Sequence, residues 1–195
     1  MIRRFFMEER NRQLEETLKE TGETLIWENV PEKFESLDKT NKTHYIISCI
    51  LIVLIAAAVS VSYYIKMSGG VIGLYVIVWL LAAIIMFSTL SIPAKVRKCG
   101  YYMTDKRVIV FTNSDDMRVI PFKSVKEYRF MKDEDGHTTL LVGKNAVNLP
   151  ASKWRALSLD PVDADESSGT ILKAGVYAIP NVDEFRKLFT DRVKL

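Results

Sequence analysis

The sequence predicts an α+β membrane protein, in which a two-helix transmembrane hairpin precedes an antiparallel β domain that ends in one helix. Three observations support this fold class. Two long apolar blocks without a charged residue run from 45 to 65 and from 71 to 92. Short β-prone runs, separated by turn residues, follow from about residue 100. An amphipathic stripe then occupies the C-terminal end of the chain.

The hairpin follows from the length of the two blocks. Tyr45 to Ile65 has 21 residues, which span roughly 31 Å as a helix and match a bilayer core of about 30 Å. Val71 to Ile92 has 22 residues, and Pro93 after it predicts a stop. Lys66 to Gly70 form the turn between them. Neither block contains an ionisable Asp, Glu, Lys, Arg or His, which argues against an ion or solute path through this chain alone.

The hairpin divides the chain into an N-terminal arm (1–44), the hairpin (45–92) and a C-terminal domain (94–195). Within the arm, residues 2–20 favour a helix. Residues 24–27 form one short β-prone run, which could pair with the sheet formed later in the chain. The cationic and aromatic start of the arm, residues 2–6, fits either an anchor in the headgroup region or a helix that packs on the domain. A polar connector is expected over residues 33–43.

Charge near the membrane predicts the orientation. The turn of the hairpin carries one cation, Lys66, whereas the flanks carry several, namely Lys39, Lys42, Lys95, Arg97 and Lys98. The positive-inside rule therefore places both termini in the cytoplasm, in a multi-pass protein of the inner or plasma membrane. The segment 94–195 carries 18 Lys and Arg against 14 Asp and Glu, a net charge of +4. This is too small for a nucleic-acid partner but suits a domain beside an anionic lipid surface. Cys49 and Cys99 are too few and too poorly placed for a disulfide framework.

The C-terminal domain is predicted to be a meander of antiparallel strands. Turn residues separate β-prone runs at 101–103, 107–111, 117–122, 125–131, 138–142 and 170–179. A segment over about 149–169, rich in proline, acids, serine and glycine, is interpreted as a mobile loop. Asn181 is expected to cap a final helix whose apolar stripe closes the β core or docks a partner, and this stripe comprises Val182, Phe185, Leu188 and Phe189.

Three short motifs resemble the bacterial membrane-anchored pleckstrin-homology-like (bacterial PH) family. Residues 102–109, Tyr-Met-Thr-Asp-Lys-Arg-Val-Ile, are similar to its Tyr-x-Leu-Thr-Asp-x-Arg-Leu signature. Residues 119–125 resemble its Ile-Pro-Leu-x-x-Ile step between strands, and residues 22–27 resemble its Gly-Glu-x-Ile-Leu segment ahead of the membrane spans. The resemblance implies a half-open PH-like β-barrel or sandwich capped by a helix, without catalytic residues. The segment 149–169 departs from the family pattern as an insertion.

A search for catalytic chemistry is negative. Thr138 stands where a phosphate-binding loop ahead of Gly143-Lys144 needs glycine, and no nucleophile elbow occurs. The two histidines, His44 and His137, lack partners at zinc spacing. We therefore expect a protein that is not an enzyme, with no catalytic, metal or cofactor-binding residues.

The expected function is binding. The candidate contact residues for lipid headgroups or an acidic partner form a basic rim: Lys106, Arg107, Arg118, Lys123, Lys126 and Arg129. A structural interpretation of residues 104–107 is favoured, in which Thr104 and Asp105 satisfy turn amides and Arg107 pairs with a carboxylate or carbonyl. The expected partners are the lipid bilayer and a protein partner or a second copy of the chain. The chain would then recruit or assemble a partner at the cytoplasmic face, and the alternative is an accessory subunit that joins a larger membrane complex through its hairpin.

Overall fold

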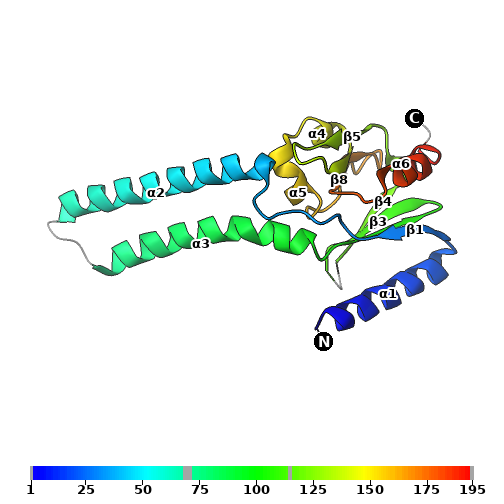
Figure 1. Cartoon of the computed structure of the whole chain (residues 1–195), viewed down its shortest axis with the longest axis horizontal. Coiled ribbons are helices and arrows are strands. Elements are labelled where there is room, and N and C mark those ends of the chain that lie inside the picture. Colours follow the sequence, from blue (N-terminus) through cyan, green and yellow to red (C-terminus); the bar gives the residue numbers. More distant parts are fainter. Residues whose placement is uncertain (1, 68–71, 114–115, 194–195) are drawn as a thin grey trace.

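The hairpin predicted from the two apolar blocks dominates the shape of the molecule. The computed structural model describes residues 2–67, 72–113 and 116–193. Two long helices, α2 (Lys39–Met67) and α3 (Ile72–Val96), project from one end of a β domain (Figure 1). Both are long and apolar enough to span a membrane, and only 6% of the most apolar stretch of each is buried within the chain. Most of the predicted turn, 66–70, lies outside the described residues.

The two helices contact each other through small side chains. Ala56 in α2 and Ala82 in α3 are only 4% and 5% exposed. Small residues let helix backbones approach closely, as the alanine clusters predict. Tyr63 and Tyr75 add an edge-to-face ring contact, with 5.9 Å between their centroids.

Both predicted ends of the hairpin on the domain side need correction. Helix α2 begins at Lys39 rather than Tyr45, because the Asp38 carboxylate accepts a hydrogen bond from the Asn41 backbone N–H at 3.0 Å and caps the first turn. Helix α3 does not stop at Pro93 but continues to Val96. Proline lacks its own N–H, yet its φ suits a helix, and the Arg97 N–H still bonds the Pro93 carbonyl at 3.1 Å.

The first sheet contains a strand from each side of the hairpin. Its antiparallel order is β1 (Leu25–Asn29), β2 (Gly100–Thr104), β3 (Arg107–Phe111) and β4 (Met117–Pro121). Strand β1 corresponds to the run predicted at 24–27, and it pairs with β2. The hairpin is therefore inserted between two neighbouring strands of one sheet.

The second sheet follows the meander predicted from the turn residues. Its order is β5 (Tyr128–Lys132), β6 (Thr138–Val142), β8 (Ile171–Val176) and β7 (Asp163–Ala164). A 3-10 turn, η1 (Phe122–Ser124), occupies the end of the run predicted at 117–122, and β5 begins later than predicted. In the described part of the chain the two sheets remain separate and do not close into a barrel.

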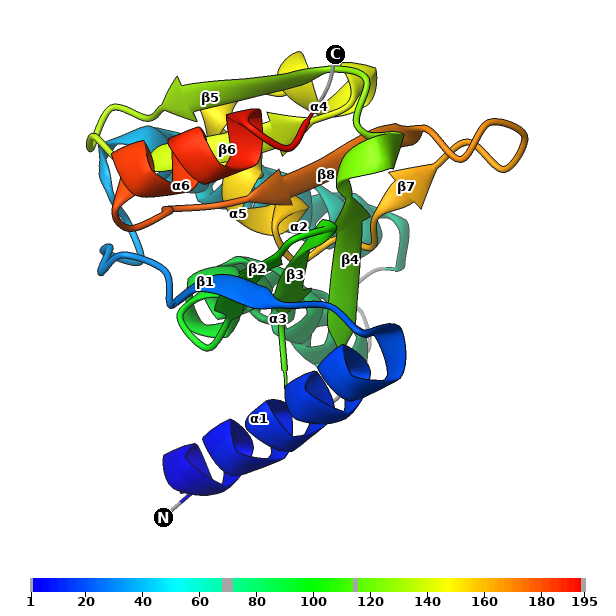
Figure 2. The ribbon, with the colours of Figure 1, turned by 90° about the vertical axis from the view of Figure 1, so that its right-hand side faces the viewer.

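The final helix, α6 (Val182–Thr190), lies beside β5 and β8 and covers the core between the sheets (Figure 2). Phe185 and Phe189 are fully buried. Phe185 meets Trp27 of β1 edge to face at 4.9 Å, so both ends of the sequence contribute to this core. The predicted cap is wrong: Asn181 is in a left-handed conformation, with φ of 49°, and its side chain makes no capping hydrogen bond.

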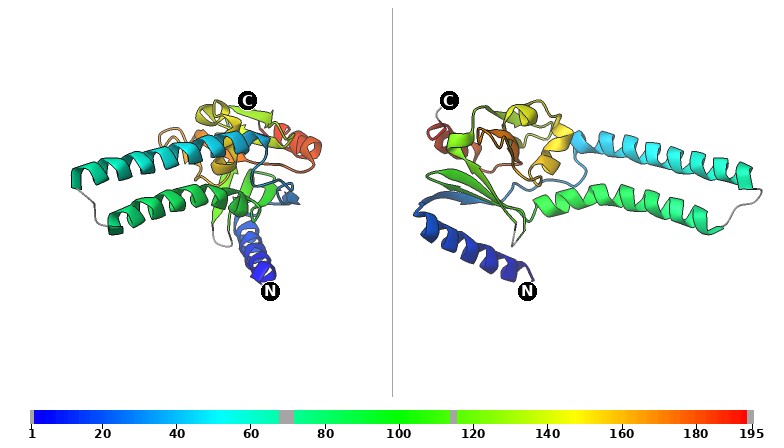
Figure 3. Two further views of the ribbon diagram at one scale, coloured as in Figure 1. Left: turned by 60° about the vertical axis from the view of Figure 1, so that its left-hand side comes forward. Right: turned by 180° about the vertical axis from the view of Figure 1, so that it is seen from behind.

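Helix α1 (Ile2–Thr21) packs on the outer face of the first sheet (Figure 2). Leu14, 5% exposed, lies in a cluster with Tyr102, Ile109 and Phe111. The second half of this helix therefore packs on the domain. The side chains of residues 2–6, for which an anchor or packing was expected, lie outside the part that the structure describes. Its N-terminal end points toward the side of the domain from which the hairpin projects (Figure 3).

The segment predicted as a mobile loop, 149–169, contains regular structure. After the short helix α4 (Lys144–Val147) come η2 (Ala151–Lys153), α5 (Trp154–Leu157) and β7. Trp154 and Leu157 are 3% and 2% exposed, because one helical turn places both on the same face against Phe34 and Tyr177. This apolar pair anchors the segment between the second sheet and the hairpin.

Candidate functional site

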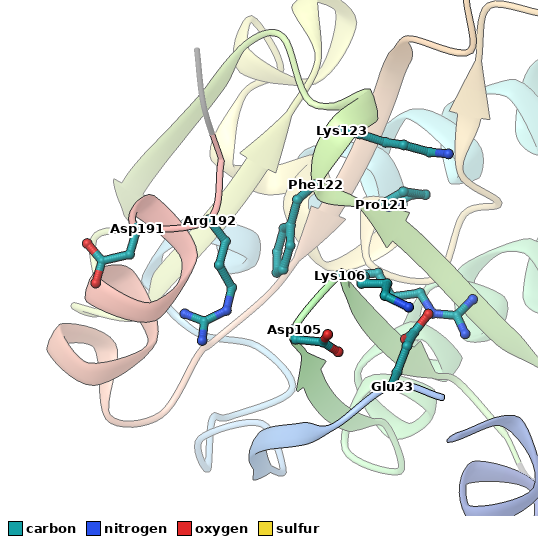
Figure 4. Close-up of a pocket in the computed structure, with 9 residues that line it drawn as sticks. Glu23, Asp105, Lys106, Pro121, Phe122, Lys123, Asp191 and Arg192 are labelled. Carbon is teal, nitrogen blue, oxygen red and sulfur yellow. The ribbon is translucent and has the colours of Figure 1, made fainter. Parts of the chain in front are cut away.

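The six cations of the predicted basic rim do not form one surface. Lys106, Arg107 and Lys123 line a cavity of about 650 Å³, which we call the distal pocket (Figure 4). Arg118 lines a different cavity. Lys126 and Arg129 line neither of these two cavities.

The separation of Arg118 from Lys123 follows from strand geometry. The side chains belong to opposite ends of β4 and η1, and five residues of extended chain span roughly 17 Å. Strand β2 starts just after α3, so the β2–β3 turn at 104–107 lies at the end of the sheet away from the hairpin (Figure 1). The distal pocket consequently faces away from the hairpin, and Arg118 lies on the hairpin side.

The β2–β3 turn that forms one wall of the distal pocket is held by its own polar side chains. Thr104 Oγ1 accepts hydrogen bonds from the backbone N–H groups of Lys106 and Arg107, both at 3.1 Å. Asp105 accepts one from the Thr24 N–H at 3.0 Å, which ties the turn to the start of β1. Thr104 thus has the predicted role of satisfying turn amides, whereas the Asp105 carboxylate bonds an amide of the N-terminal arm rather than one of the turn.

The Arg107 side chain is also hydrogen-bonded within the chain. Its Nε donates to Glu23 at 2.8 Å, and the Thr104 hydroxyl donates to the same carboxylate oxygen at 2.9 Å. The Glu23 side chain is 6% exposed and that of Arg107 is 17% exposed. Nη2 of Arg107 also donates to the Thr21 hydroxyl at 3.4 Å. Two of its three nitrogens are therefore used within the chain, and Arg107 shapes the pocket rather than offering free charge.

The remaining walls combine an apolar surface with cations. Pro121 and Phe122 lie beside Arg192, which follows α6 and donates to the Leu188 carbonyl at 2.9 Å. In Figure 4 the Asp191 carboxylate points away from Phe122. Phe122, which is 6% exposed, lies at the base of the pocket. The lining cations Lys106, Arg107, Lys123 and Arg192 outnumber the acids Glu23, Asp105 and Asp191 by one, which favours an acidic ligand with an apolar part.

A second cavity of about 430 Å³, which we call the hairpin-side pocket, lies between the end of α3, the β3–β4 connection and α5. Arg118 forms an ion pair with Asp116 at 2.8 Å. The Thr112 hydroxyl donates to the same carboxylate. The hydrogen bond from Arg118 is the main cause that lowers the pKa of Asp116, against the opposing effect of burial.

A buried polar network at the start of α2 was not predicted from the sequence. At its centre is Arg155 of α5, which is 2% exposed. Its guanidinium pairs with Asp38, the residue that caps α2, and donates to the carbonyls of Glu35 and Ser36 at 2.9 and 3.1 Å. It also lies over the Phe34 ring, 4.4 Å from the centroid. Arg155 therefore binds the whole segment through which the chain enters α2.

The same network extends into the second sheet. Arg155 Nε donates to the Tyr177 hydroxyl at 3.0 Å, and that hydroxyl donates to Asp133 at 2.9 Å. Burial raises the pKa of Tyr177 above its ordinary value of 10.0. Asp133 also accepts the backbone N–H of His137 at 2.9 Å in the β5–β6 turn. No local sequence signal indicates this network, because Arg155 and its partners before α2 are about 120 residues apart.

A cluster of three carboxylates and the Cys99 thiol could in principle bind a metal or react, but both are held by contacts within the chain. Asp38, Asp133 and Asp135 place carboxylate oxygens within 4.8 Å of one another. Asp38 is paired with Arg155, and Asp133 accepts hydrogen bonds from Tyr177 and the turn, so two of these three potential metal ligands already have protein partners. Burial raises the pKa of Cys99 to about 12, which leaves its thiol protonated and unreactive.

Comparisons with known proteins do not identify a relative. No protein-family model, no curated protein and no solved structure matches this chain.

Proposed function

We propose that this chain is a membrane-anchored binding protein, whose PH-like β domain holds a partner-binding pocket away from the membrane on the cytoplasmic side. The observation that carries the proposal is the distal pocket at the end of the domain opposite the hairpin. A surface in that place meets partners from the aqueous phase and not lipids of the anchoring membrane. The chain then recruits or assembles a protein at the membrane surface.

The PH-like assignment rests on the order of elements. A four-stranded antiparallel sheet, a second antiparallel sheet and a final helix over the core agree with the half-open sandwich that the resemblance implies. The three motifs lie in the arrangement expected from that family, at the start of β1, along β2–β3 and from β4 into η1. With the hairpin in a bilayer, its insertion between β1 and β2 would hold this sandwich directly at the membrane surface.

The chemistry of the distal pocket favours an acidic segment of a protein partner. Lys106, Lys123 and Arg192 supply positive charge at its rim, and Phe122 supplies an aromatic contact. An aromatic floor within a basic rim is the combination of buried anchor and polar edge found in peptide-binding surfaces. The partner segment would place an apolar side chain against Phe122 and carboxylates beside the cations.

The topology part of the proposal has a direct test in intact cells. In a variant without native cysteines, a cysteine in place of Lys66 is expected to react with a membrane-impermeant reagent, whereas one in place of Ser167 is not. Both expectations follow from the distribution of Lys and Arg around the hairpin. Labelling at position 167 in intact cells would contradict the cytoplasmic assignment.

Site-specific photo-crosslinking tests the binding role and separates it from the alternative. A crosslinker at Lys123 is expected to trap a partner, and the charge reversal Lys106→Glu with Arg192→Glu should abolish that product. The matched control is Lys126→Glu with Lys187→Glu, since both lysines are exposed and line neither pocket. If crosslinks form only from Leu80, which is 56% exposed on α3, the chain is an accessory subunit that associates through its hairpin.

A further inference from the structure

We propose that the hairpin-side pocket binds the phosphate of an anionic phospholipid headgroup from the membrane in which the hairpin sits. The inference rests on the membrane placement proposed above but not on the distal pocket or its partner. It assigns a ligand class to a second site, on the opposite side of the domain. The depth of the pocket, its charge and its unpaired donors all point to this ligand.

The position of the pocket is fixed by the end of α3. Ile92, the last residue of the apolar block, lines it together with Lys95 and Lys98. At 1.5 Å per residue, Lys95 lies about 4.5 Å beyond Ile92 along the helix axis. The headgroup layer on each side of a bilayer is roughly 5–7 Å thick, so a pocket that begins at Ile92 opens into that layer.

The free charge in the pocket is positive. Its two acidic lining residues already have partners: Asp116 pairs with Arg118, and Asp160 pairs with Lys173, each at 2.8 Å. Lys95 and Lys98 are exposed, and neither forms an ion pair with any residue in the described part of the chain. Two ammonium groups are therefore available to an anion at headgroup depth.

Arg118 supplies the second feature that points to an anionic ligand. Its side chain is 15% exposed, and only Nη2 is used in the ion pair with Asp116. Nε and Nη1 are buried, and no residue in the described ranges accepts a hydrogen bond from either. A buried N–H without an acceptor is costly, and a phosphate oxygen in the pocket would satisfy one of these two donors. Nε and Nη1 lie on opposite sides of the guanidinium, so a single phosphate takes one of them.

A lipid headgroup is favoured over a free anion by the apolar side of the pocket. Ile92, Ala156 and Leu159 line it together with the cations. Inorganic phosphate gains nothing from such a wall, whereas the glycerol and first acyl carbons below a lipid phosphate do. The same lysines also match the positive charge that cytoplasmic flanks direct at anionic lipids.

The test uses the full chain, purified in a mild non-ionic detergent and titrated with short-chain phosphatidylglycerol or phosphatidylcholine. Wild type is expected to bind the anionic lipid more tightly. Lys95→Gln with Lys98→Gln should weaken binding of phosphatidylglycerol roughly 30-fold, because two cations near the phosphate are removed. Both lysines are exposed, so the fold should survive, and circular dichroism checks this.

Controls make the result specific. Lys126→Gln with Lys187→Gln removes the same charge elsewhere on the domain and should change the affinity less than about twofold. Equal affinity for the two lipids, or an unchanged affinity in the Lys95/Lys98 variant, would overturn the proposal. Competition by inorganic phosphate as effective as that of phosphatidylglycerol would also overturn it, since the site would then take a free anion. Partner crosslinking from Lys123 is measured separately, so the two proposals fail independently.

Discussion

The β domain has two interfaces that are built from opposite kinds of side chain. Between the sheets, α6 buries Phe185 and Phe189 against other rings, including Trp27 and Phe122. At the junction with the hairpin, the centre is the buried Arg155 with its acidic and carbonyl partners. The first interface gains free energy from apolar burial, which depends little on exact geometry. The second is favourable only when every polar group is paired.

We infer that the two interfaces have different roles. The aromatic core stabilises the domain, whereas the Arg155 network fixes how the domain sits on α2, because a shifted helix would leave a buried guanidinium unpaired. The Asp133 side of the network reaches the second sheet, and the Asp38 side reaches the first turn of α2. A fixed junction would hold the hairpin-side pocket at a constant depth and the distal pocket at a constant height above the membrane.

The largest expected effect concerns the strand that precedes the hairpin. A fragment of residues 98–195 lacks β1, and with it the pairing to β2 and the buried Trp27. We expect this fragment to stay unfolded, because it exposes a sheet edge and an incomplete core. Residues 20–37, joined to it by a flexible linker in place of the hairpin, should restore a cooperative melt in circular dichroism. A fragment that folds equally well alone would show that β1 is dispensable.

The aromatic core gives the next largest effect. Phe185→Ala removes a fully buried ring and should lower the free energy of unfolding by about 3–5 kcal/mol. Lys187→Ala on the exposed side of the same helix should cost less than about 0.5 kcal/mol. Denaturant melts of the full chain measure both. A Phe185→Ala protein as stable as wild type would instead assign the apolar stripe to partner docking.

The junction should respond differently, as a coupled unit. Arg155→Met alone leaves Asp38 buried without its partner and is expected to cost about 3 kcal/mol. Adding Asp38→Asn removes the unpaired charge, so the double variant should lose less than the sum of the two single variants. Denaturant melts of the four proteins complete this cycle. Additive losses would mean that the pair is not coupled and that the junction is held by packing alone.

The sequence predicted the elements of the apolar core but not the polar network at the junction with the hairpin. The strands, the apolar blocks and the α6 stripe were visible because their signals are local: alternation, length and helical spacing. Of the basic rim, Lys106, Arg107 and Lys123 do lie together, since one end of the sheet collects them. Arg118 was misplaced because about one strand length of extended chain separates it from Lys123, which puts the two side chains at opposite ends of the sheet. The Arg155 network joins segments far apart in the sequence, and only the fold brings them together.

The start of α2 is the one junction feature that the sequence could have shown. Asp38 stands at the N-cap position before Lys39, and Asn41 three residues later is bonded to it through both backbone and side chain. The predicted boundary was Tyr45 because the apolar block begins there. The helix itself begins six residues earlier, in polar sequence. Helix caps thus mark the true boundary better than hydropathy when a span continues out of the membrane into a domain.

The smallest expected effect is a pH dependence at the hairpin-side pocket. Hydrogen bonds from Arg118 and Thr112 lower the pKa of Asp116 below its ordinary value of 3.8 in the folded chain. Because the folded pKa is the lower one, the contribution of Asp116 to stability is fully present above pH of about 5 and is lost as the pH falls through the folded pKa. The Asp116 side chain is 50% exposed, so solvent screening keeps this contribution small. Thermal melts of wild type and Asp116→Asn should therefore differ slightly but constantly at neutral pH and converge in acid. A difference that grows as the pH falls would mean that the carboxylate is stabilised in its protonated form, and that Arg118 is not its partner.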